Sequence, residues 1–437
     1  MVYFQGHKHK GQGILSWLYR SQFSIINAFF AAVIFLIPVY GAMLFLAQDL
    51  SVGALVVQSI FAPIAIAIWL YLPKKASFWF GFLVGLGLFY WVGLSLRFSM
   101  LGFLIPFVMV LVALVYGVIF YCLLFYQNLV FRIASLLLMG YIHPFGFDWL
   151  TFKMFFSYSI FGIDNWSFFC LILGVGLVLR FRRYYKLLGV GLLVMAVSWS
   201  GYKGQDMALA LEDIAVTSTH VNQDFKWQSQ NIEQIIGGNL EHIYQAIAKG
   251  KKIIILPETA FPFALNQSDL MGTLKNLSYS ITIITGALRA QDKDVYNSTY
   301  IFEKGKFSYA DKVILAPFGE EIPLPDFLAK PIYREFFGGE MGLSAGREFK
   351  HFIAEGLEFT PAICYEGTSE RTYAHHPKYM ILMSNNGWFV PSIEPFLQRL
   401  LIKYYARAYG TIVIHSANQS SAYVVSPNIL GDIAIKS

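Results

Sequence analysis

Three residues in the C-terminal half of the sequence combine a thiol, a carboxylate and an amine. Cys364 ends an apolar, strand-like run, while Glu258 and Lys312 lie at or beside the ends of other short apolar runs. A thiol attacks a carbonyl carbon as its thiolate, and a nearby carboxylate can accept its proton. A fixed ammonium group stabilises the negative charge that then develops on the carbonyl oxygen. These residue types predict acyl transfer with Cys364 as nucleophile, Glu258 as base and Lys312 as oxyanion stabiliser.

The cysteine usage indicates that Cys364 is a free thiol. The chain has three cysteines, and Cys122 and Cys170 fall within long apolar stretches typical of membrane spans. Cys364 therefore has no disulfide partner in its own domain. For each residue alone there is a simpler alternative: a buried core cysteine, a solvated carboxylate at Glu258 and a surface ion pair at Lys312.

The composition excludes an ordinary soluble protein. Of the 437 residues, 56% are hydrophobic, 17% are aromatic and 14% are charged, and the mean hydropathy is +0.52. The net charge of +6 is unevenly placed, because residues 1–207 hold 13 Lys and Arg against four Asp and Glu, and the remainder holds 20 against 23. A basic excess in loops between apolar stretches indicates membrane topology, and no basic patch interleaved with aromatic residues supports nucleic-acid binding.

Long apolar stretches follow from residue 21, each close to the roughly 20 residues needed to cross a bilayer. The stretch 140–162 is too polar and broken for a plain span, so we expect it to be interfacial or re-entrant. We predict seven spans, at residues 22–47, 50–72, 77–96, 99–126, 129–146, 165–180 and 187–201.

Basic residues in the loops predict the orientation. With the N-terminus inside, the segments on the inner side hold ten Lys and Arg, whereas the outer loops before the last span hold only Arg97 and Lys153. The positive-inside rule then places the chain after about residue 201 on the outer face.

The sequence pattern changes from long apolar stretches to shorter mixed segments after the last predicted span. Short β-rich runs alternate with helical patterns such as 231–248 and 394–409. This alternation predicts an α/β domain with a helix-covered sheet, at residues 205–437, after a transmembrane domain of about seven helices at residues 11–204.

The N-terminal residues 1–10 are interpreted as the remnant of an expression tag. They contain Tyr-Phe-Gln-Gly, which looks like part of a protease cleavage site, followed by a His/Lys run. They are therefore left out of the functional reasoning.

Four motifs lie at residues 256–262, 312–320, 364–366 and 384–389. Together they resemble the apolipoprotein N-acyltransferase family, membrane-anchored members of the nitrilase superfamily. The order Glu, Lys, Cys along the chain is the one that this superfamily uses. Residues 80–92 are also similar to the third span of the family. Many members continue through further strands and another span, so we expect this chain to be a short natural variant or a truncated one.

The resemblance implies a multi-pass α-helical membrane domain in the bacterial inner membrane, followed by a periplasmic nitrilase-like domain, an α-β-β-α sandwich. It implies a two-step transfer that needs neither a metal nor a cofactor. A phospholipid, commonly phosphatidylethanolamine, acylates Cys364, and the acyl chain then passes to the N-terminal amine of a diacylglyceryl apolipoprotein. By motif match, Glu320 orients Lys312 or the incoming groups. Further supporting or substrate-binding positions are Asn297, Tyr365, Glu366 and Trp388.

Both implied substrates are lipids, and each methylene kept out of water is worth about 0.8 kcal/mol. We therefore expect the site to face the outer leaflet. Trp388 and the loops 261–263 and 336–339 are candidates for covering the site or dipping into lipid, with core packing as the alternative.

Two other functions fit parts of the sequence. A membrane-tethered amidase would release the acyl group to water, and the three catalytic residue types do not exclude it. A transporter or lipid-binding scaffold is disfavoured by the intact Glu258, Lys312 and Cys364, and by the scarcity of acidic residues in the spans.

Overall fold

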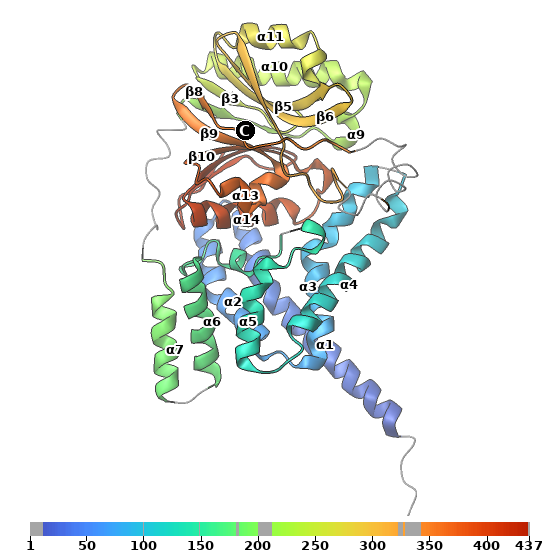
Figure 1. The fold of residues 1–437 in the computed structure, drawn as a ribbon, viewed down its shortest axis with the longest axis vertical. Coiled ribbons are helices and arrows are strands. Elements are labelled where there is room, and N and C mark those ends of the chain that lie inside the picture. Colours follow the sequence, from blue (N-terminus) through green and yellow to red (C-terminus); the bar gives the residue numbers. More distant parts are fainter. Residues whose placement is uncertain are drawn as a thin grey trace, which may run out of the picture.

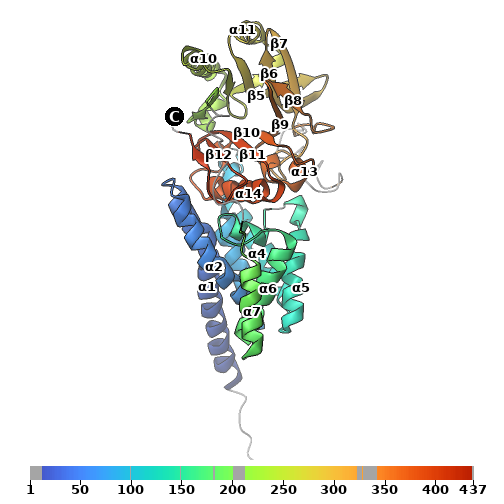
Figure 2. The same cartoon turned by 90° about the vertical axis from the view of Figure 1, so that its left-hand side faces the viewer.

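A computed structural model describes residues 12–98, 100–147, 149–180, 183–199, 212–321, 327 and 342–435. In these residues, a helical half and a half built from two β-sheets are stacked along the long axis of the molecule (Figures 1 and 2). The expected tag remnant, the expected domain boundary at 204–205 and the loop 336–339 lie outside the described residues.

The helical half contains four segments that are long and apolar enough to cross a membrane, within the described residues. These are α1, α2, α3 with its 3₁₀ continuation, and α4. Bulky side chains of α1 such as Phe29, Phe30 and Val33 are about half exposed, as expected for a surface that faces lipid. The helices are α1 (Gln12–Leu46), α2 (Ser51–Tyr71), α3 (Ser77–Phe89) continued by Tyr90–Phe98, α4 (Ile105–Leu123), α5 (Leu129–Leu138), α6 (Asn165–Arg180) and α7 (Tyr184–Met195).

The last three helices are shorter than a full span. α5, α6 and α7 have 10, 16 and 12 residues, hence lengths of roughly 15–24 Å against about 30 Å of hydrocarbon. α7 ends early because residues 196–198 leave the helix and form backbone hydrogen bonds with residues 160–162. The predicted spans at 129–146 and 187–201 correspond to α5 and α7, whose bounds are shorter or shifted, and their crossing of the membrane stays a prediction.

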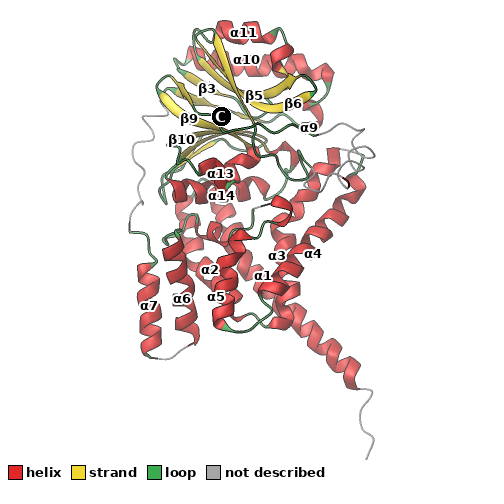
Figure 3. Cartoon of the chain, in the orientation of Figure 1, coloured by secondary structure: helices red, strands yellow, loops and turns green. Residues whose placement is uncertain are grey.

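The second half contains two sheets of mixed strand direction (Figure 3). The strand order is β1-β3-β5-β6-β7 in the first sheet, with β4 beside β5, and β13-β12-β11-β10-β9-β8 in the second, with β2 beside β11. The strands are β1 (Ile214–Val216), β2 (Ser218–Thr219), β3 (Ile253–Ile255), β4 (Phe261–Ala264), β5 (Thr282–Gln291), β6 (Asp294–Glu303), β7 (Lys306–Asp311), β8 (Phe352–Ala354), β9 (Leu357–Ile363), β10 (Tyr379–Asn385), β11 (Ile412–Asn418), β12 (Tyr423–Val425) and β13 (Ile433–Ala434). The helices are α9 (Gln223–Lys226), α10 (Ile232–Ala248), α11 (Leu270–Leu277), α13 (Glu370–Tyr373) and α14 (Glu394–Tyr409).

Alternating isoleucines in β3 show how the layers form. Ile253 and Ile255 pack between the sheets with Ile363 of β9 and Ile381 of β10, whereas Ile254 packs on the opposite face with α10 and α11. α14 covers the outer face of the second sheet. The layers therefore run helix, sheet, sheet, helix, as the resemblance implied.

α14 is apolar on two faces because it lies between the second sheet and the membrane helices. Ile402 and Ala406 pack on the sheet, while Leu397 and Leu400 belong to the core of the helical half. Gly410 follows in the left-handed conformation, with a φ of 74°, and ends the helix.

The stretch after α5 forms short 3₁₀ turns and a buried aromatic cluster. Phe152, Phe155 and Phe156 are at most 2% exposed. The carbonyl groups of Phe156 and Ser157 accept hydrogen bonds from Arg407 of α14, at 2.9 and 2.8 Å. This part of the stretch connects the two halves of the protein, and its interfacial or re-entrant position stays a prediction.

The segment 261–263 belongs to β4. Phe261 is fully buried beside Ala287 of β5, in the core beneath α10 and α11. Core packing is therefore the correct alternative for this segment, and the prediction that it contacts lipid is wrong.

Candidate active site

The three predicted catalytic residues all follow the C-terminal ends of strands. Glu258 comes shortly after β3, Lys312 directly after β7 and Cys364 directly after β9. β3 and β7 belong to the first sheet and β9 belongs to the second, and the face-to-face packing of the sheets brings the strand ends together. Lys312 interacts electrostatically with both Glu258 and Cys364, so the three groups share one site.

Cys364 occupies a sharp transition from strand to turn. Ile363 is extended, with φ −121° and ψ 117°, whereas Cys364 has a φ of 50° and begins a 3₁₀ turn. A positive φ at a residue with a side chain costs on the order of 1–2 kcal/mol, so neighbouring contacts must stabilise it. The thiol is partly exposed, and its sulfur lies 4.0 Å from Nε2 of Gln398 on α14.

Glu366 joins the end of β9 to the segment after β7. Its Oε1 accepts hydrogen bonds from the backbone N–H groups of Val313 (2.6 Å) and Ile314 (3.1 Å), and its Oε2 accepts one from Ile363 (2.8 Å). Burial raises the pKa of Glu366 to about 7, although Lys312 and these N–H groups oppose the rise. Glu366 thus connects the end of the strand that precedes Cys364 to the segment that follows Lys312.

A chain of polar side chains connects Lys312 to Glu258. Lys312 donates to Oε2 of Glu320 at 2.5 Å, and Nδ2 of Asn297 lies 2.7 Å from Oε1 of Glu258 and 3.3 Å from Oε1 of Glu320. The backbone N–H of Asn385, at the end of β10, donates to the other oxygen of Glu258 at 2.7 Å. These contacts hold the amine and the carboxylate in fixed positions.

Burial and neighbouring charges shift the pKa values of Glu258, Cys364 and Lys312. Burial raises the pKa of Glu258, an effect that Lys312 opposes and Glu320 reinforces. Burial and Glu258 hold the pKa of Cys364 well above its usual range, while Lys312 lowers it. Burial alone would lower the pKa of Lys312, but Glu320 and Glu258 outweigh burial and raise it, so the amine stays a cation. A neutral thiol therefore lies beside a base of raised proton affinity and a permanent positive charge.

Gly286 of β5 allows the segment that carries the base to approach the sheet. A Cβ atom at this position would lie 2.7 Å from Cα of Glu258 and 2.7 Å from the backbone nitrogen of Thr259. Any side chain here would displace the carboxylate.

The sequence comparisons agree with this geometry. The model of the apolipoprotein N-acyltransferase integral membrane domain matches residues 22–199. The apolipoprotein N-acyltransferase of Helicobacter pylori is 43% identical over 415 residues, which are 94% of this chain and 97% of that protein. The chain belongs to the apolipoprotein N-acyltransferase family. The resemblance seen in the sequence motifs is thereby confirmed.

Another relative and one solved structure are also similar to this chain. The apolipoprotein N-acyltransferase of Wolinella succinogenes is 40% identical over 398 residues, covering 90% of this chain and 95% of that protein. Among solved structures, a CN-hydrolase superfamily protein from Xanthomonas campestris is 14% identical, with a TM-score of 0.38, and covers 51% of this chain and 86% of that one.

Tyr365 anchors the turn that begins at Cys364 to the helical half. Its ring is 4% exposed and stacks at 6.2 Å on Phe147 and at 6.4 Å on Trp149, which belong to the stretch after α5. Its hydroxyl donates to the carbonyl of Gly146 at 3.1 Å. These contacts are those of a packing residue at the junction of the two halves.

Trp388 lies in the turn after β10 and contacts the membrane half. Its ring packs edge to face on Phe98 at 5.5 Å and lies 6.5 Å from Trp227. Arg97 donates to the carbonyl groups of Gly387 (3.1 Å) and Trp388 (3.4 Å) and to that of the residue two positions further on. The candidate gate is thus fixed to the end of the third membrane segment, and its role in covering the site remains a prediction.

Several residues near the site escaped the sequence analysis, among them Arg97, Glu394 and Gln398. Arg97 counted only as a basic residue in an outer loop, although a lone arginine among aromatic residues was a signal. Glu394 and Gln398 are a polar pair four positions apart on α14, next to the 384–389 motif, and both are buried. Their spacing places them on one face of the helix, and this was the signal that could have found them.

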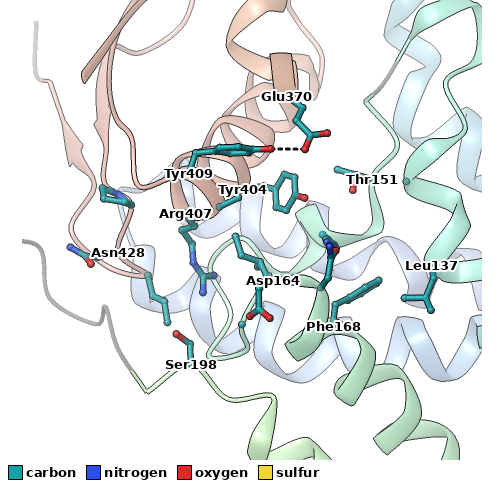
Figure 4. A pocket seen from close by; sticks show the side chains of 18 of the residues that line it. Leu137, Thr151, Asp164, Phe168, Ser198, Glu370, Tyr404, Arg407, Tyr409 and Asn428 are labelled. Atoms are coloured by element: carbon teal, nitrogen blue, oxygen red, sulfur yellow. Dashed lines mark hydrogen bonds between the residues drawn. The ribbon is translucent and has the colours of Figure 1, made fainter. Parts of the chain in front are cut away.

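A cavity of about 600 Å³ lies elsewhere, between the C-terminal end of α14 and the membrane half (Figure 4). Its charged side chains are already engaged: Tyr409 donates to Glu370 at 2.5 Å, Asp164 caps α6, and Arg407 binds backbone carbonyl groups. None of the three catalytic residues lines it. We therefore do not assign the reaction to this cavity.

Proposed function

We propose that this protein transfers an acyl chain from a phospholipid, through a thioester on Cys364, to the N-terminal amine of the diacylglyceryl-cysteine of apolipoproteins. Family membership gives the reaction class. The observation that carries the assignment is the convergence of Glu258, Lys312 and Cys364 at three strand ends, in a sheet domain stacked on membrane helices.

In the first half-reaction Glu258 accepts the proton of Cys364, and the thiolate attacks the ester carbonyl carbon of the phospholipid. The ammonium of Lys312 stabilises the oxyanion that forms, and Glu320 keeps this ammonium in place. When the tetrahedral intermediate collapses, the proton on Glu258 passes to the leaving oxygen of the lysophospholipid. The acyl chain is then a thioester on the sulfur.

In the second half-reaction the amine of the lipoprotein attacks the thioester carbon, and the thiolate leaves. A single cysteine holds a single acyl group, so donor and acceptor use the site in turn. Ping-pong kinetics follow, with lysophospholipid released before the acceptor arrives. Trp388 covers the thioester against water in this scheme, and the contacts of its turn with Arg97 support that position.

The donor and the location are part of the same proposal. Phosphatidylethanolamine is the proposed donor, and the proposed location is the bacterial inner membrane with the catalytic half in the periplasm. A reporter that is active only in the periplasm, fused after Gly204, tests the orientation. Activity only of a cytoplasmic reporter at that position would contradict both the orientation and the lipoprotein substrate.

The direct test is intact-mass analysis of the purified protein after incubation with phosphatidylethanolamine in detergent. We expect one acyl adduct, which Cys364→Ser abolishes because a hydroxyl has a far higher pKa than a thiol. Cys122→Ala is the matched control, since Cys122 lies in α4, and should retain the adduct. An adduct on Cys364→Ala protein would refute the mechanism. Loss of the adduct to water alone, when a lipoprotein acceptor is present, would favour the amidase alternative.

A further inference from the structure

Glu394 is a buried carboxyl group that the mechanism above does not use. It is the first residue of α14 and only 1% exposed, and its Oε2 has no hydrogen-bond partner among the described residues. Leaving a buried polar atom without a partner is unfavourable, and more so for a charged group. Such an atom at a reaction site indicates a group that a substrate satisfies.

Glu394 lies on the side of α14 that faces the nucleophile. Gln398, one helical turn later, lies 4.0 Å from the sulfur of Cys364 and 3.4 Å from the hydroxyl of Ser384. Residues four apart share one face of a helix, so Glu394 faces the same site. Its charge also acts on Cys364, for which it disfavours the thiolate.

Three titratable groups interact with Glu394. Glu258 follows β3, Cys364 follows β9 and Tyr423 belongs to β12. Burial, reinforced by Glu258, raises the pKa of Glu394 to about 8. A free α-amino group has a pKa of about 8 as well, so a proton shared between the two groups has nearly the same free energy on either.

The second half-reaction has one more proton to remove than Glu258 can handle. The acceptor arrives as an ammonium ion, R–NH₃⁺, and the product amide keeps a single N–H. Two protons therefore leave the nitrogen. One returns to the sulfur of Cys364 through Glu258, which restores the thiol. The other must be accepted before attack, because an ammonium ion has no free electron pair. Hydrolysis of the same thioester needs no such additional acceptor.

We propose that Glu394 is this second proton acceptor: its carboxylate binds the ammonium of the incoming acceptor, takes one proton and releases it to solvent. The carbon–nitrogen bond then forms as the carbon–sulfur bond breaks, and charge and atoms balance. This inference rests on the proposed function and adds a determinant of preference for amines over water. Glu394 acts in the second half-reaction and not in the first.

The test separates the half-reactions. Acyl-enzyme is first formed with phosphatidylethanolamine, and its formation is followed by intact mass in Glu394→Gln and in the parent. The acyl-enzyme is then mixed with a diacylglyceryl-cysteinyl peptide or, separately, with hydroxylamine, which is mostly neutral at pH 7. Glu233→Gln is the matched control, because Glu233 lies in the first turn of α10 and is exposed.

We expect Glu394→Gln to form the acyl-enzyme at the parental rate or faster and to transfer to the peptide about 10²-fold more slowly, the lower end of what a general base contributes. Transfer to hydroxylamine should be unchanged. The defect should stay similar at every pH below about 8, because ionised Glu394 in the parent and neutral amine in the variant both rise about tenfold per pH unit in that range.

The results for Glu394→Gln and the parent separate the role of Glu394 from the proposed function. Equal slowing of the peptide and hydroxylamine reactions, or parental transfer to the peptide at every pH, would overturn the role of Glu394. A loss of acyl-enzyme formation in Glu394→Gln would show a role in the first half-reaction instead, and would likewise overturn it. Failure of the parent to form any acyl-enzyme would refute the proposed function itself. Parental transfer to the peptide by Glu394→Asp, with loss in Glu394→Gln, would support the need for a carboxylate.

Discussion

Replacing Glu366 by glutamine removes one hydrogen bond from the connection between the nucleophile and the lysine. The carboxylate accepts three backbone N–H groups, those of Val313 and Ile314 on one oxygen and that of Ile363 on the other. An amide has only one acceptor oxygen, so its NH₂ group must face at least one N–H donor. The best orientation keeps the two bonds to Val313 and Ile314 and loses the bond to Ile363.

The size of the effect follows from this count. A hydrogen bond to a charged group is worth about 1.5–3 kcal/mol, and each 1.36 kcal/mol corresponds to a factor of ten in rate. If loss of the hydrogen bond to Ile363 lets Cys364 move away from Lys312, the activation free energy rises by this amount. We then expect Glu366→Gln to form the acyl adduct about 10- to 150-fold more slowly. Any free energy by which the substitution destabilises the folded protein itself should lower Tm.

The assay is the rate of adduct formation by intact mass, together with a thermal melt of the same detergent-solubilised sample. Glu358→Gln serves as control, because Glu358 belongs to the same strand and is exposed. A Glu366→Gln protein that matches the parent in both adduct rate and Tm would refute the positioning role. A full loss of the adduct with an unchanged Tm would point to direct chemistry by Glu366 instead.

Three further results are expected. Lys312→Ala should slow adduct formation by roughly 10² or more, the scale for loss of an oxyanion donor, and parental kinetics would require another role for this residue. Alkylation by iodoacetamide should require higher pH in Lys312→Ala and lower pH in Glu258→Gln, because Lys312 lowers and Glu258 raises the pKa of Cys364; the reverse order would contradict the assigned charges. The adduct should nevertheless fail to form in Glu258→Gln, which lacks the base. Gly286→Ala should cost about 1–3 kcal/mol of stability and most of the activity, because its Cβ would overlap the backbone at Glu258. Gly238→Ala has open space around its Cβ position and should have neither effect. Equal effects of the two substitutions would refute the close approach of Glu258 to β5.

The chemical types were readable from the sequence because they depend on composition and local order. A lone cysteine after an apolar run, with a carboxylate and a lysine in a characteristic order, indicated thioester chemistry before any distance was available. The helices at 231–248 and 394–409 were predicted from their periodicity and agree with α10 and α14. These features are local, so a one-dimensional pattern records them.

Helix lengths and burial were not readable in the same way. The apolar stretches at 129–146 and 187–201 satisfy a hydropathy criterion, but α5 passes into a 3₁₀ turn and backbone pairing with residues 160–162 ends α7 early. Phe261 looked like a lipid-facing residue because hydropathy does not distinguish lipid from a protein core, and only its pairing with β5 makes it core.

The connections within the site were decided by the tertiary structure alone. Nothing in the order of residues shows that Glu366 accepts N–H groups from residues about fifty positions away, or that Arg97 binds the turn of Trp388. Glu394 looks like an ordinary residue at the start of a helix until packing buries its carboxylate beside the nucleophile. The sequence by itself determined which groups can react, because that is a property of side-chain chemistry. Only folding decided which of them lie within reach of one another, because the packing of two sheets and a membrane half sets those distances.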